Sequence, residues 1–269
     1  MAEVKTRKTF SLIIVRHGEG FHNLGTHTRD DLEFTDDERL RTINSTLTEK
    51  GLMQASLVAD RLRNTKFDLA FTSDLKRARL TAEAIKKKND SIKELISWKV
   101  VRERCLGDFE GAVDLYRALR TVENAVSDRS YLTWRPPNGE SVQDLRDRVL
   151  EFLVKIQMEV SKISVESPII LVSSHGLFMD ELYYVISSSE YGQTLPKKMP
   201  GYQNTGIVQY TVTTRMVDQN TPVIEKVECP TLSCANHLEN YDENYVSCRG
   251  GCHGLLDDQT IQEIDGQPR

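Results

Sequence analysis

The sequence lacks any apolar run that approaches the roughly 20 residues a membrane-spanning helix needs, so it predicts no transmembrane segment. Residues 1–8 carry basic side chains but no apolar segment of the kind found in secretory signals, and we therefore expect a cytoplasmic protein. Positive charge is not in excess either. The formal net charge of −5 argues against a nucleic-acid-binding surface spread over the whole chain. Internal repeats and low-complexity tracts are also absent.

What is present is the balance of a folded protein. Hydrophobic residues make up 39% and charged residues 28% of the 269 positions, which excludes a generally disordered chain. This length suits one large domain or two small ones.

Two apolar runs end in a histidine followed by a glycine. The run 12–15 leads into Arg16-His17-Gly18-Glu19, and the run 169–172 leads into Ser173-Ser174-His175-Gly176. Both runs have the length and composition of buried strands. Open α/β sheets bind ligands at the carboxyl ends of their strands. We therefore expect both histidines at one sheet edge, around a shared site.

The remaining patterns alternate between strands and helices. Apolar spacing predicts strands at 10–15, 67–71, 100–101, 169–172, 206–212 and 223–227, with helices after the caps Thr48 and Ser73 and over 141–163 and 177–188. A weaker helical pattern covers 114–126, and Pro136-Pro137-Asn138-Gly139 predicts a turn. Alternation of this kind predicts an α/β fold, with three layers (α/β/α) and a mostly parallel central sheet.

A polar, acid-rich segment at 24–46 separates the first strand from the first long helix. Its length is unusual for a loop inside a compact domain. Two interpretations stay open: a lid near the site, or a solvated insertion with a short helix.

The residues at the strand ends suit phosphoryl transfer. A neutral imidazole is a competent nucleophile, and covalent catalysis divides one difficult step into two easier ones. Arg16 and Arg77 can bind phosphate oxygens in a bidentate manner. Glu103 is the best candidate for the proton donor to the leaving group. Taken singly, each residue has an ordinary structural explanation; together, they supply the required charge without a metal or another cofactor.

Several motifs in order resemble the histidine phosphatase superfamily, which has the phosphoglycerate mutase-like fold. The similarity spans roughly 10–212 and consists of Arg16-His17-Gly18-Glu19 with Asn23, Leu47-Thr48-Glu49-Lys50-Gly51, Ser73-Asp74-Leu75-Lys76-Arg77, Arg102-Glu103-Arg104 with Gly107, Pro136-Pro137-Asn138-Gly139-Glu140-Ser141, and Ser174-His175-Gly176. Within the family, the chain is most similar to the fructose-2,6-bisphosphatase branch.

The resemblance implies roles for individual residues. His17 would be the phosphorylated nucleophile, and Glu103 the acid and then the base. The groups that would hold the phosphoryl oxygens are Arg16, Arg77 and His175. We expect Gly18, Gly20, Asn23, Arg104 and Gly176 to contribute to substrate binding. Gly20 departs from the family pattern, in which Ser or Thr is usual at this position.

The leading hypothesis is a metal-independent phosphohydrolase acting on a small phosphorylated metabolite, with fructose 2,6-bisphosphate as the candidate. Alternatives are a broad-specificity or protein phosphatase, a phosphoglycerate mutase, and a phosphate-binding scaffold with little turnover. The mutase is disfavoured because Arg104-Cys105-Leu106-Gly107 lacks the aromatic pattern typical of mutases. The only partner we expect is the small phosphorylated substrate, with no nucleic acid and no membrane; protein partners are not assigned.

Four of the five cysteines lie in the tail, at Cys229, Cys234, Cys248 and Cys252. We divide the chain into a catalytic domain at 1–228, which includes the 24–46 insertion, and a cysteine-bearing extension at 229–269. Clustered thiols with His237 and His253 nearby suit zinc, but the spacing is looser than usual. Ordinary reduced thiols are favoured over a zinc site or a redox disulfide.

Overall fold

A central six-stranded sheet organises the part of the chain that the computed structural model describes, which is 7–24, 33–36, 42–110, 132–190, 201–218 and 221–241. The strands are β1 (Arg7–Arg16), β2 (Leu69–Thr72), β3 (Ile96–Ser97), β4 (Ile169–Ser174), β5 (Ile207–Met216) and β6 (Pro222–Cys234). Their spatial order is β3-β2-β4-β1-β5-β6. The first four strands in sequence pair in parallel, while β5 and β6 add an antiparallel edge. The mostly parallel sheet is confirmed.

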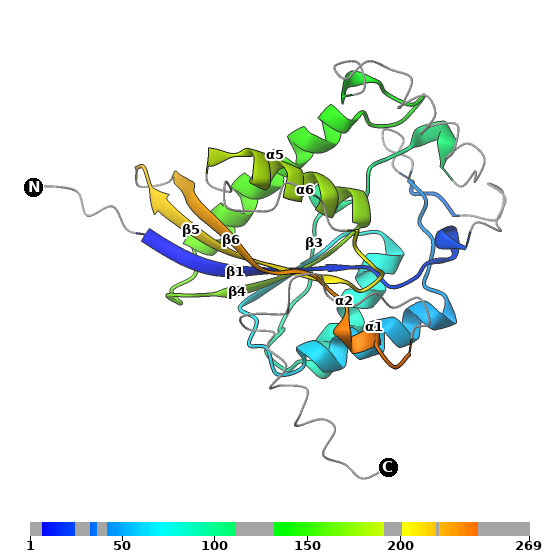
Figure 1. Ribbon diagram of the computed structural model, residues 1–269, viewed down its shortest axis with the longest axis horizontal. Coiled ribbons are helices and arrows are strands. Elements are labelled where there is room, and N and C mark those ends of the chain that lie inside the picture. The colour runs from blue at the N-terminus through cyan, green and yellow to red at the C-terminus, as the bar shows by residue number, and fades with distance from the viewer. Residues whose placement is uncertain are drawn as a thin grey trace, which may run out of the picture.

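Helices cover both faces of this sheet, as Figure 1 shows. One face carries α1 (Glu49–Leu62) and α2 (Lys76–Lys88), and the other carries α5 (Val142–Ser161) and α6 (Gly176–Ser188). Short 3₁₀ helices complete the described elements: η1 (Phe21–Asn23), η3 (Lys99–Val101), η4 (Gly107–Phe109) and η6 (Asn236–Leu238). The α/β/α layering is therefore confirmed. None of the described helices combines the length and the apolarity needed to cross a bilayer.

The alternation of side chains along β1 creates two cores. Leu12 and Ile14 pack with residues of α5 and α6, whereas Ile13 and Val15 pack with α1 and α2 residues such as Leu62. Both cores are built from almost fully buried side chains. Their apolar burial, at roughly 25 cal/mol per Å², holds the strand in a fixed register and so fixes where its polar end emerges.

Three of the four helix starts follow the sequence prediction, with α6 beginning at Gly176, one residue before the predicted start. Thr48 accepts a hydrogen bond from Gly51 N, and Ser141 forms a capping box with Asp144. The Ser73 cap is wrong, because α2 begins later and Leu75 occupies the N-cap position. Ser73 Oγ accepts from the Leu75 backbone instead.

The strand predicted at Val100-Val101 is also wrong. The pairing strand is β3, and Val100 and Val101 lie in η3, where turn hydrogen bonds replace a ladder. Both valines are buried, which explains why the sequence pattern imitates a strand. The turn at 136–139 is confirmed, with Asn138 at a φ of 58°. The predicted helix at 114–126 lies outside the described residues.

The strand β6 crosses the expected boundary after residue 228. It stays paired with β5 as far as the partners Ile207 and Cys234, so the start of the extension belongs to the sheet. Cys229 is a free thiol, but Cys234 is disulfide-bonded, so the expectation of a reduced thiol is wrong there. The part of the tail up to residue 241 contributes to no cluster of three or more metal-ligating side chains among the described residues.

Candidate active site

The two histidines meet at the carboxyl edge of the sheet. Adjacent parallel strands β1 and β4 pair Arg16 with Ser174, so His17 and His175 follow directly after partnered residues. Their ring centroids lie 5.1 Å apart. Both side chains are buried, with exposures of 1% and 0%. The prediction that both strands deliver an imidazole to one edge of the sheet is confirmed.

Hydrogen bonds fix the tautomer of His17. Nδ1 lies 2.7 Å from the carbonyl oxygen of Gly18, which can only accept, so Nδ1 carries the proton. Nε2 then keeps its lone pair and receives Arg77 Nε at 3.3 Å. The backbone nitrogen of His17 donates to Ser174 O at 3.0 Å. His17 Nε2 is therefore the nucleophilic atom available in this pocket.

Burial and charge keep both imidazoles neutral. Burial lowers the pKa of His17 well below its ordinary value, and the cations Arg77 and Arg16 lower it further. The pKa of His175 is lowered in the same way, first by burial and then by Arg77. A neutral imidazole at physiological pH is the form that attacks phosphorus.

Neither ring nitrogen of His175 has a hydrogen-bond partner within the described part of the chain, although both atoms are buried. Buried polar atoms without partners are uncommon, and both ring nitrogens are able to form a hydrogen bond with a ligand. The cations Arg16 and Arg77 both lower the pKa of His175, so both lie near its ring. The arrangement suits an anion placed between His17 and His175.

Arg77 lies beside His17 and is anchored by a second segment of the chain. Its side chain is 2% exposed, and Nη1 donates to Ile43 O at 2.7 Å. Burial lowers the pKa of this guanidinium to about 10, while Glu103 and Glu110 oppose the shift. The group therefore stays charged at neutral pH and can bind phosphoryl oxygens.

Arg16 is the last residue of β1 and directly precedes His17 at the same edge of the sheet. Its Nη1 donates to Tyr202 O at 2.6 Å. A Cβ placed on Gly176 would lie 3.5 Å from Arg16 Nε, so the guanidinium packs against the first residue of α6.

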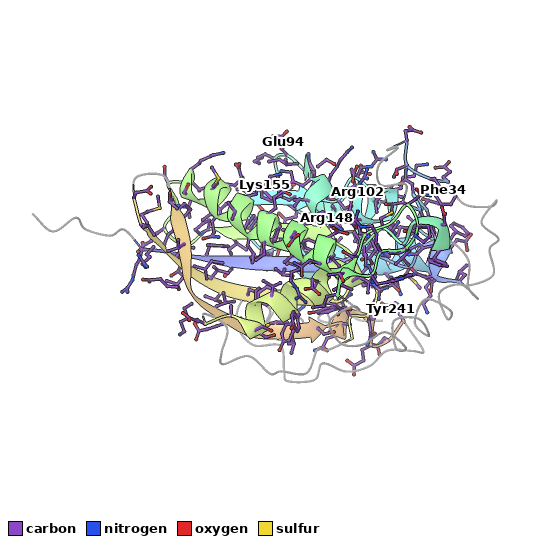
Figure 2. All side chains as sticks on the ribbon, turned by 90° about the horizontal axis from the view of Figure 1, so that it is seen from above. Phe34, Glu94, Arg102, Arg148, Lys155 and Tyr241 are labelled. Atoms are coloured by element: carbon purple, nitrogen blue, oxygen red, sulfur yellow. The ribbon has the colours of Figure 1, made fainter. Side chains whose placement is uncertain are left out.

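The candidate acid Glu103 lies in a braced loop. Its carboxylate oxygens accept from the backbone nitrogens of Arg104 at 2.9 Å and Leu177 at 3.3 Å. Arg148 on α5, labelled in Figure 2, donates to the carbonyls of Arg102 and Glu103. These contacts hold a half-buried carboxyl group near Arg77, whose pKa it influences.

A second carboxyl group, Glu110, lies close to Arg77 and Glu103. Burial raises its pKa to about 7, although the hydrogen bond from Leu106 N lowers it. This side chain is 7% exposed. At neutral pH the pocket wall therefore contains a carboxyl group that is partly protonated.

Close backbone contact explains the first glycine of the strand-end motif. A Cβ on Gly18 would lie 2.5 Å from Gly51 O, and a Cβ on Gly51 would lie 2.0 Å from Glu19 O. Only glycine allows the loop after β1 to lie directly on the start of α1. Thr81 Oγ1 accepts from Gly18 N at 3.0 Å on the α2 side.

The end of the insertion forms part of the pocket wall, which the sequence did not show. Ile43 O anchors Arg77, Asn44 Oδ1 accepts from the Lys76 nitrogen at the start of α2, and Ser45 Oγ lies 2.6 Å from His22 Nδ1. Thr42, Ile43 and Ser45 are buried, so this part is not a solvated insertion. No motif or periodicity in 42–46 could have indicated these contacts.

Residues after 200 contact the backbone of His17. The carbonyl of His17 accepts from Asn204 Nδ2 at 3.0 Å and from Thr205 N at 3.2 Å. Thr205 has a φ of 58° and its hydroxyl lies 3.0 Å from His237 Nε2. The tail residue His237 in η6 thus contacts the segment that holds the His17 carbonyl, a contact that a zinc-site interpretation missed.

The other residues expected to bind substrate lie in different segments of the chain. Gly18 and Gly20 follow His17 in the chain, and Asn23 Oδ1 accepts from Gly20 N at 2.9 Å. Arg104 is buried, and its Nε donates to Glu140 O at 2.9 Å, so it braces the loop that carries Glu103. Its part in substrate binding stays a prediction.

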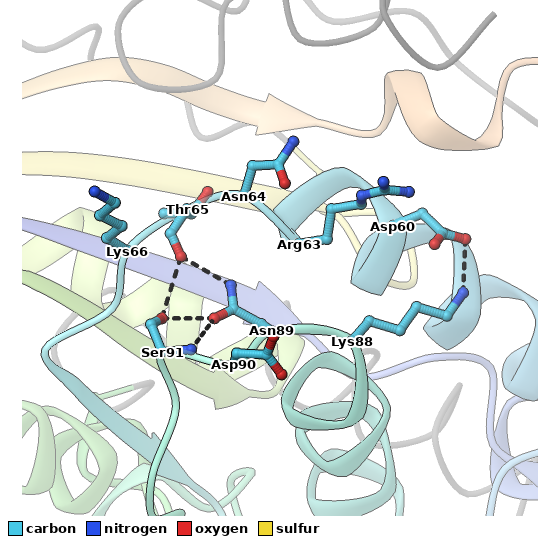
Figure 3. Close-up of a pocket in the computed structure, with 9 residues that line it drawn as sticks. All are labelled: Asp60, Arg63, Asn64, Thr65, Lys66, Lys88, Asn89, Asp90 and Ser91. Carbon is cyan, nitrogen blue, oxygen red and sulfur yellow. Dashed lines mark hydrogen bonds and ion pairs between the residues drawn. The ribbon is translucent and has the colours of Figure 1, made fainter.

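A cavity of about 620 Å³ lies elsewhere, at the ends of α1 and α2. Figure 3 shows its lining, in which Lys88 pairs with Asp60, and Asn89 bonds to Thr65 and Ser91. It lies at the amino edge of the parallel strands, opposite the histidines. Five of its nine lining residues bond to one another, and the lining contains no nucleophile–base arrangement.

Comparisons with known proteins agree with this geometry. The model of the histidine phosphatase superfamily (branch 1) matches residues 12–218. The fructose-2,6-bisphosphatase TIGAR of Xenopus tropicalis is 26% identical over 86% of this chain and 95% of its own length. A 2,3-bisphosphoglycerate-dependent phosphoglycerate mutase of Bartonella henselae is 34% identical over 62% of this chain and 76% of its own.

Solved structures show the same fold. A mycobacterial glucosyl-3-phosphoglycerate phosphatase aligns with a TM-score of 0.61 at 20% identity, covering 84% of this chain and 99% of that protein. The phosphoglycerate mutase of Bacillus anthracis aligns with a TM-score of 0.58 at 22% identity, covering 81% and 92%. With a family model that spans most of the sheet and both histidines, the chain belongs to the histidine phosphatase superfamily, whose members are phosphatases and mutases.

Proposed function

We propose that the chain is a metal-independent phosphohydrolase that works through a phosphohistidine at His17. The observation that carries the proposal is the state of this imidazole. Its Nδ1 proton is held by Gly18 O, and its Nε2 lone pair lies beside Arg77 and next to His175, whose ring nitrogens have no hydrogen-bond partner among the described residues. Cationic and neutral donors around one nucleophile supply the charge stabilisation that phosphoryl transfer needs.

In the first step, Nε2 of His17 attacks phosphorus, and the bond from phosphorus to the ester oxygen breaks. Glu103 gives its proton to the departing oxygen, so an alcohol leaves rather than an alkoxide. Arg16, Arg77 and His175 stabilise the charge on the phosphoryl oxygens as it develops.

In the second step, the Glu103 carboxylate takes a proton from water while the water oxygen attacks phosphorus. The phosphorus–nitrogen bond breaks, inorganic phosphate leaves, and Nε2 recovers its lone pair. The leaving alcohol and the water occupy the same side of the phosphoryl group in turn, so one carboxyl group serves both steps.

The substrate class we propose is a small phosphorylated metabolite, with fructose 2,6-bisphosphate as the first candidate. Support comes from the TIGAR relative, which matches most of both chains. The phosphoglycerate mutases among the relatives make mutase activity the alternative outcome. One hydroxyl or methylene changes selectivity by only about 1–3 kcal/mol in an apolar pocket, so the substrate must be identified by assay.

The test is a panel of fructose 2,6-bisphosphate, fructose 1,6-bisphosphate, phosphoglycerates and phosphopeptides, with a mutase assay in parallel. We expect His17→Ala to lower hydrolysis by at least about 10³-fold, because it removes the covalent step. Glu103→Gln should accumulate phosphoenzyme that is stable to alkali and labile to acid. Full activity of His17→Ala would overturn the covalent mechanism.

A further inference from the structure

A third imidazole, His22, lies beside the catalytic pair, and the proposed mechanism gives it no role. Its ring centroid is 5.4 Å from that of His17. Electrostatic interaction with His22 lowers the pKa of both His17 and His175, so the three rings lie close together. Whereas those two residues are fully buried, His22 is half-buried, so its ring lies nearer the surface than theirs.

The contacts of Asn23 determine the tautomer of His22. Asn23 Oδ1 accepts from Gly20 N at 2.9 Å, so the amide nitrogen is the atom that faces His22 Nε2 at 3.1 Å. An amide nitrogen only donates, which makes His22 Nε2 the acceptor. The imidazole proton then lies on Nδ1 and is donated to Ser45 Oγ at 2.6 Å.

The glycine at position 20 makes room for this imidazole. A Cβ on Gly20 would lie 2.8 Å from His22 Nδ1 and 3.0 Å from Ser45 Oγ. The His22 ring therefore takes the space that the Ser or Thr usual at position 20 would need. Ser45 comes from the buried end of the insertion, so Gly20 and the insertion meet at one place.

We propose that His22, held by Ser45, is a positioning residue that orients the Asn23 amide for the transferring phosphoryl group. One amide proton of Asn23 goes to His22 and its oxygen takes Gly20 N, which leaves the second amide proton for a phosphoryl oxygen. The inference rests on the proposed function, because it assigns a role in phosphoryl binding. An exposed asparagine without such support would have to be ordered by the ligand.

The neutral state of His22 supports this role. Burial lowers its pKa well below the ordinary value, and Arg77 and Arg16 lower it further. A protonated ring would present a second donor to the Asn23 amide nitrogen and would break the contact.

The experiment uses the full chain in six forms: wild type, His22→Phe, His22→Gln, Asn23→Ala, the double variant His22→Phe/Asn23→Ala, and the control Leu24→Ala. Phe keeps the ring shape but removes both hydrogen bonds, while Gln retains an acceptor for Asn23. Leu24 is exposed and follows the same 3₁₀ helix, so its truncation reports nonspecific effects of changing this loop. The readouts are kcat and KM for p-nitrophenyl phosphate, and the affinity for inorganic phosphate by calorimetry.

We expect His22→Phe to weaken phosphate affinity and kcat/KM by about threefold to tenfold, the factor that corresponds to ordering one side chain. In the Asn23→Ala background the same change should have almost no effect, because the two residues act as one unit. His22→Gln should recover part of the loss. The inference would be overturned if His22→Phe lowered phosphate affinity by the same factor in the wild type and in Asn23→Ala. It would also be overturned if His22→Phe caused no loss in the wild type.

Two further outcomes, a variant that does not fold and a wild type without hydrolase activity, each have their own test. If His22→Phe does not fold, Ser45→Ala replaces it, since it removes the acceptor of the His22 proton and should also lose its effect in the Asn23→Ala background. If the wild type hydrolyses no phosphomonoester, the proposed function fails, and phosphate affinity across the same variants still decides whether His22 positions Asn23.

Discussion

Glu110 should make the stability of this protein depend on pH in an unusual direction. Burial raises its pKa to about 7, from an ordinary value of 4.5. Between these values the folded state binds a proton that the unfolded state has released. Stability from this group is therefore fully present below about pH 4.5 and is lost as the pH rises through about 7. At about 1.36 kcal/mol per pH unit, the loss amounts to about 3 kcal/mol.

Glu110→Gln tests this reasoning. The amide oxygen can still accept from Leu106 N, but the group no longer titrates. We expect urea unfolding at pH 5 to 9 to show that the free energy of unfolding of the variant, minus that of the wild type, increases by up to about 3 kcal/mol as the pH rises.

The difference between the two proteins is needed because other groups titrate in the same range. The pKa values of His17 and His175 are lowered in the folded state, so the protein becomes less stable as the pH falls below the ordinary pKa of histidine. This trend is opposite to the one that Glu110 produces. Glu151→Gln, in an exposed ion pair with Lys155, is the matched control and should give a flat difference curve. A flat curve for Glu110→Gln as well would refute the idea that burial of this carboxyl group controls its protonation.

Three further changes probe the scaffold of the site. Arg77→Lys should lower kcat/KM for p-nitrophenyl phosphate by about 10- to 100-fold, because ammonium cannot donate to phosphate and Ile43 O in the same fork geometry; wild-type kinetics would contradict this. Gly18→Ala should cost about 1–3 kcal/mol in urea unfolding through its 2.5 Å contact with Gly51 O, whereas Gly201→Ala, with nothing within 4 Å, should be neutral. His237→Ala should lower kcat more than it raises KM, since Thr205 loses its support behind His17, and equal effects on both would point to general loosening.

The sequence was sufficient to predict the parts of the site that depend on local pattern. Leu12–Val15 and Ile169–Val172 are buried strands whose polar ends follow at once, so the meeting of His17 and His175 follows from parallel pairing alone. Ser141 and Asp144 form their capping box within four residues, and the helix start could be predicted for the same reason. The Val100-Val101 strand failed because burial, which the pattern reports, does not distinguish a strand from a buried turn.

Contacts that join distant segments could not be predicted in this way. Ile43 contributes only its carbonyl to Arg77, and any residue type offers a carbonyl. His237 reaches Thr205 across 32 positions, and nothing in either residue specifies the other. Position 20 is different, because the missing hydroxyl was visible in the sequence while its replacement by the His22 ring was not. A departure from a family motif is therefore most informative where a neighbouring side chain could occupy the space that the usual residue would fill. Gly20 meets this condition, because His22 follows it in the same turn and its ring lies where a side chain at position 20 would be.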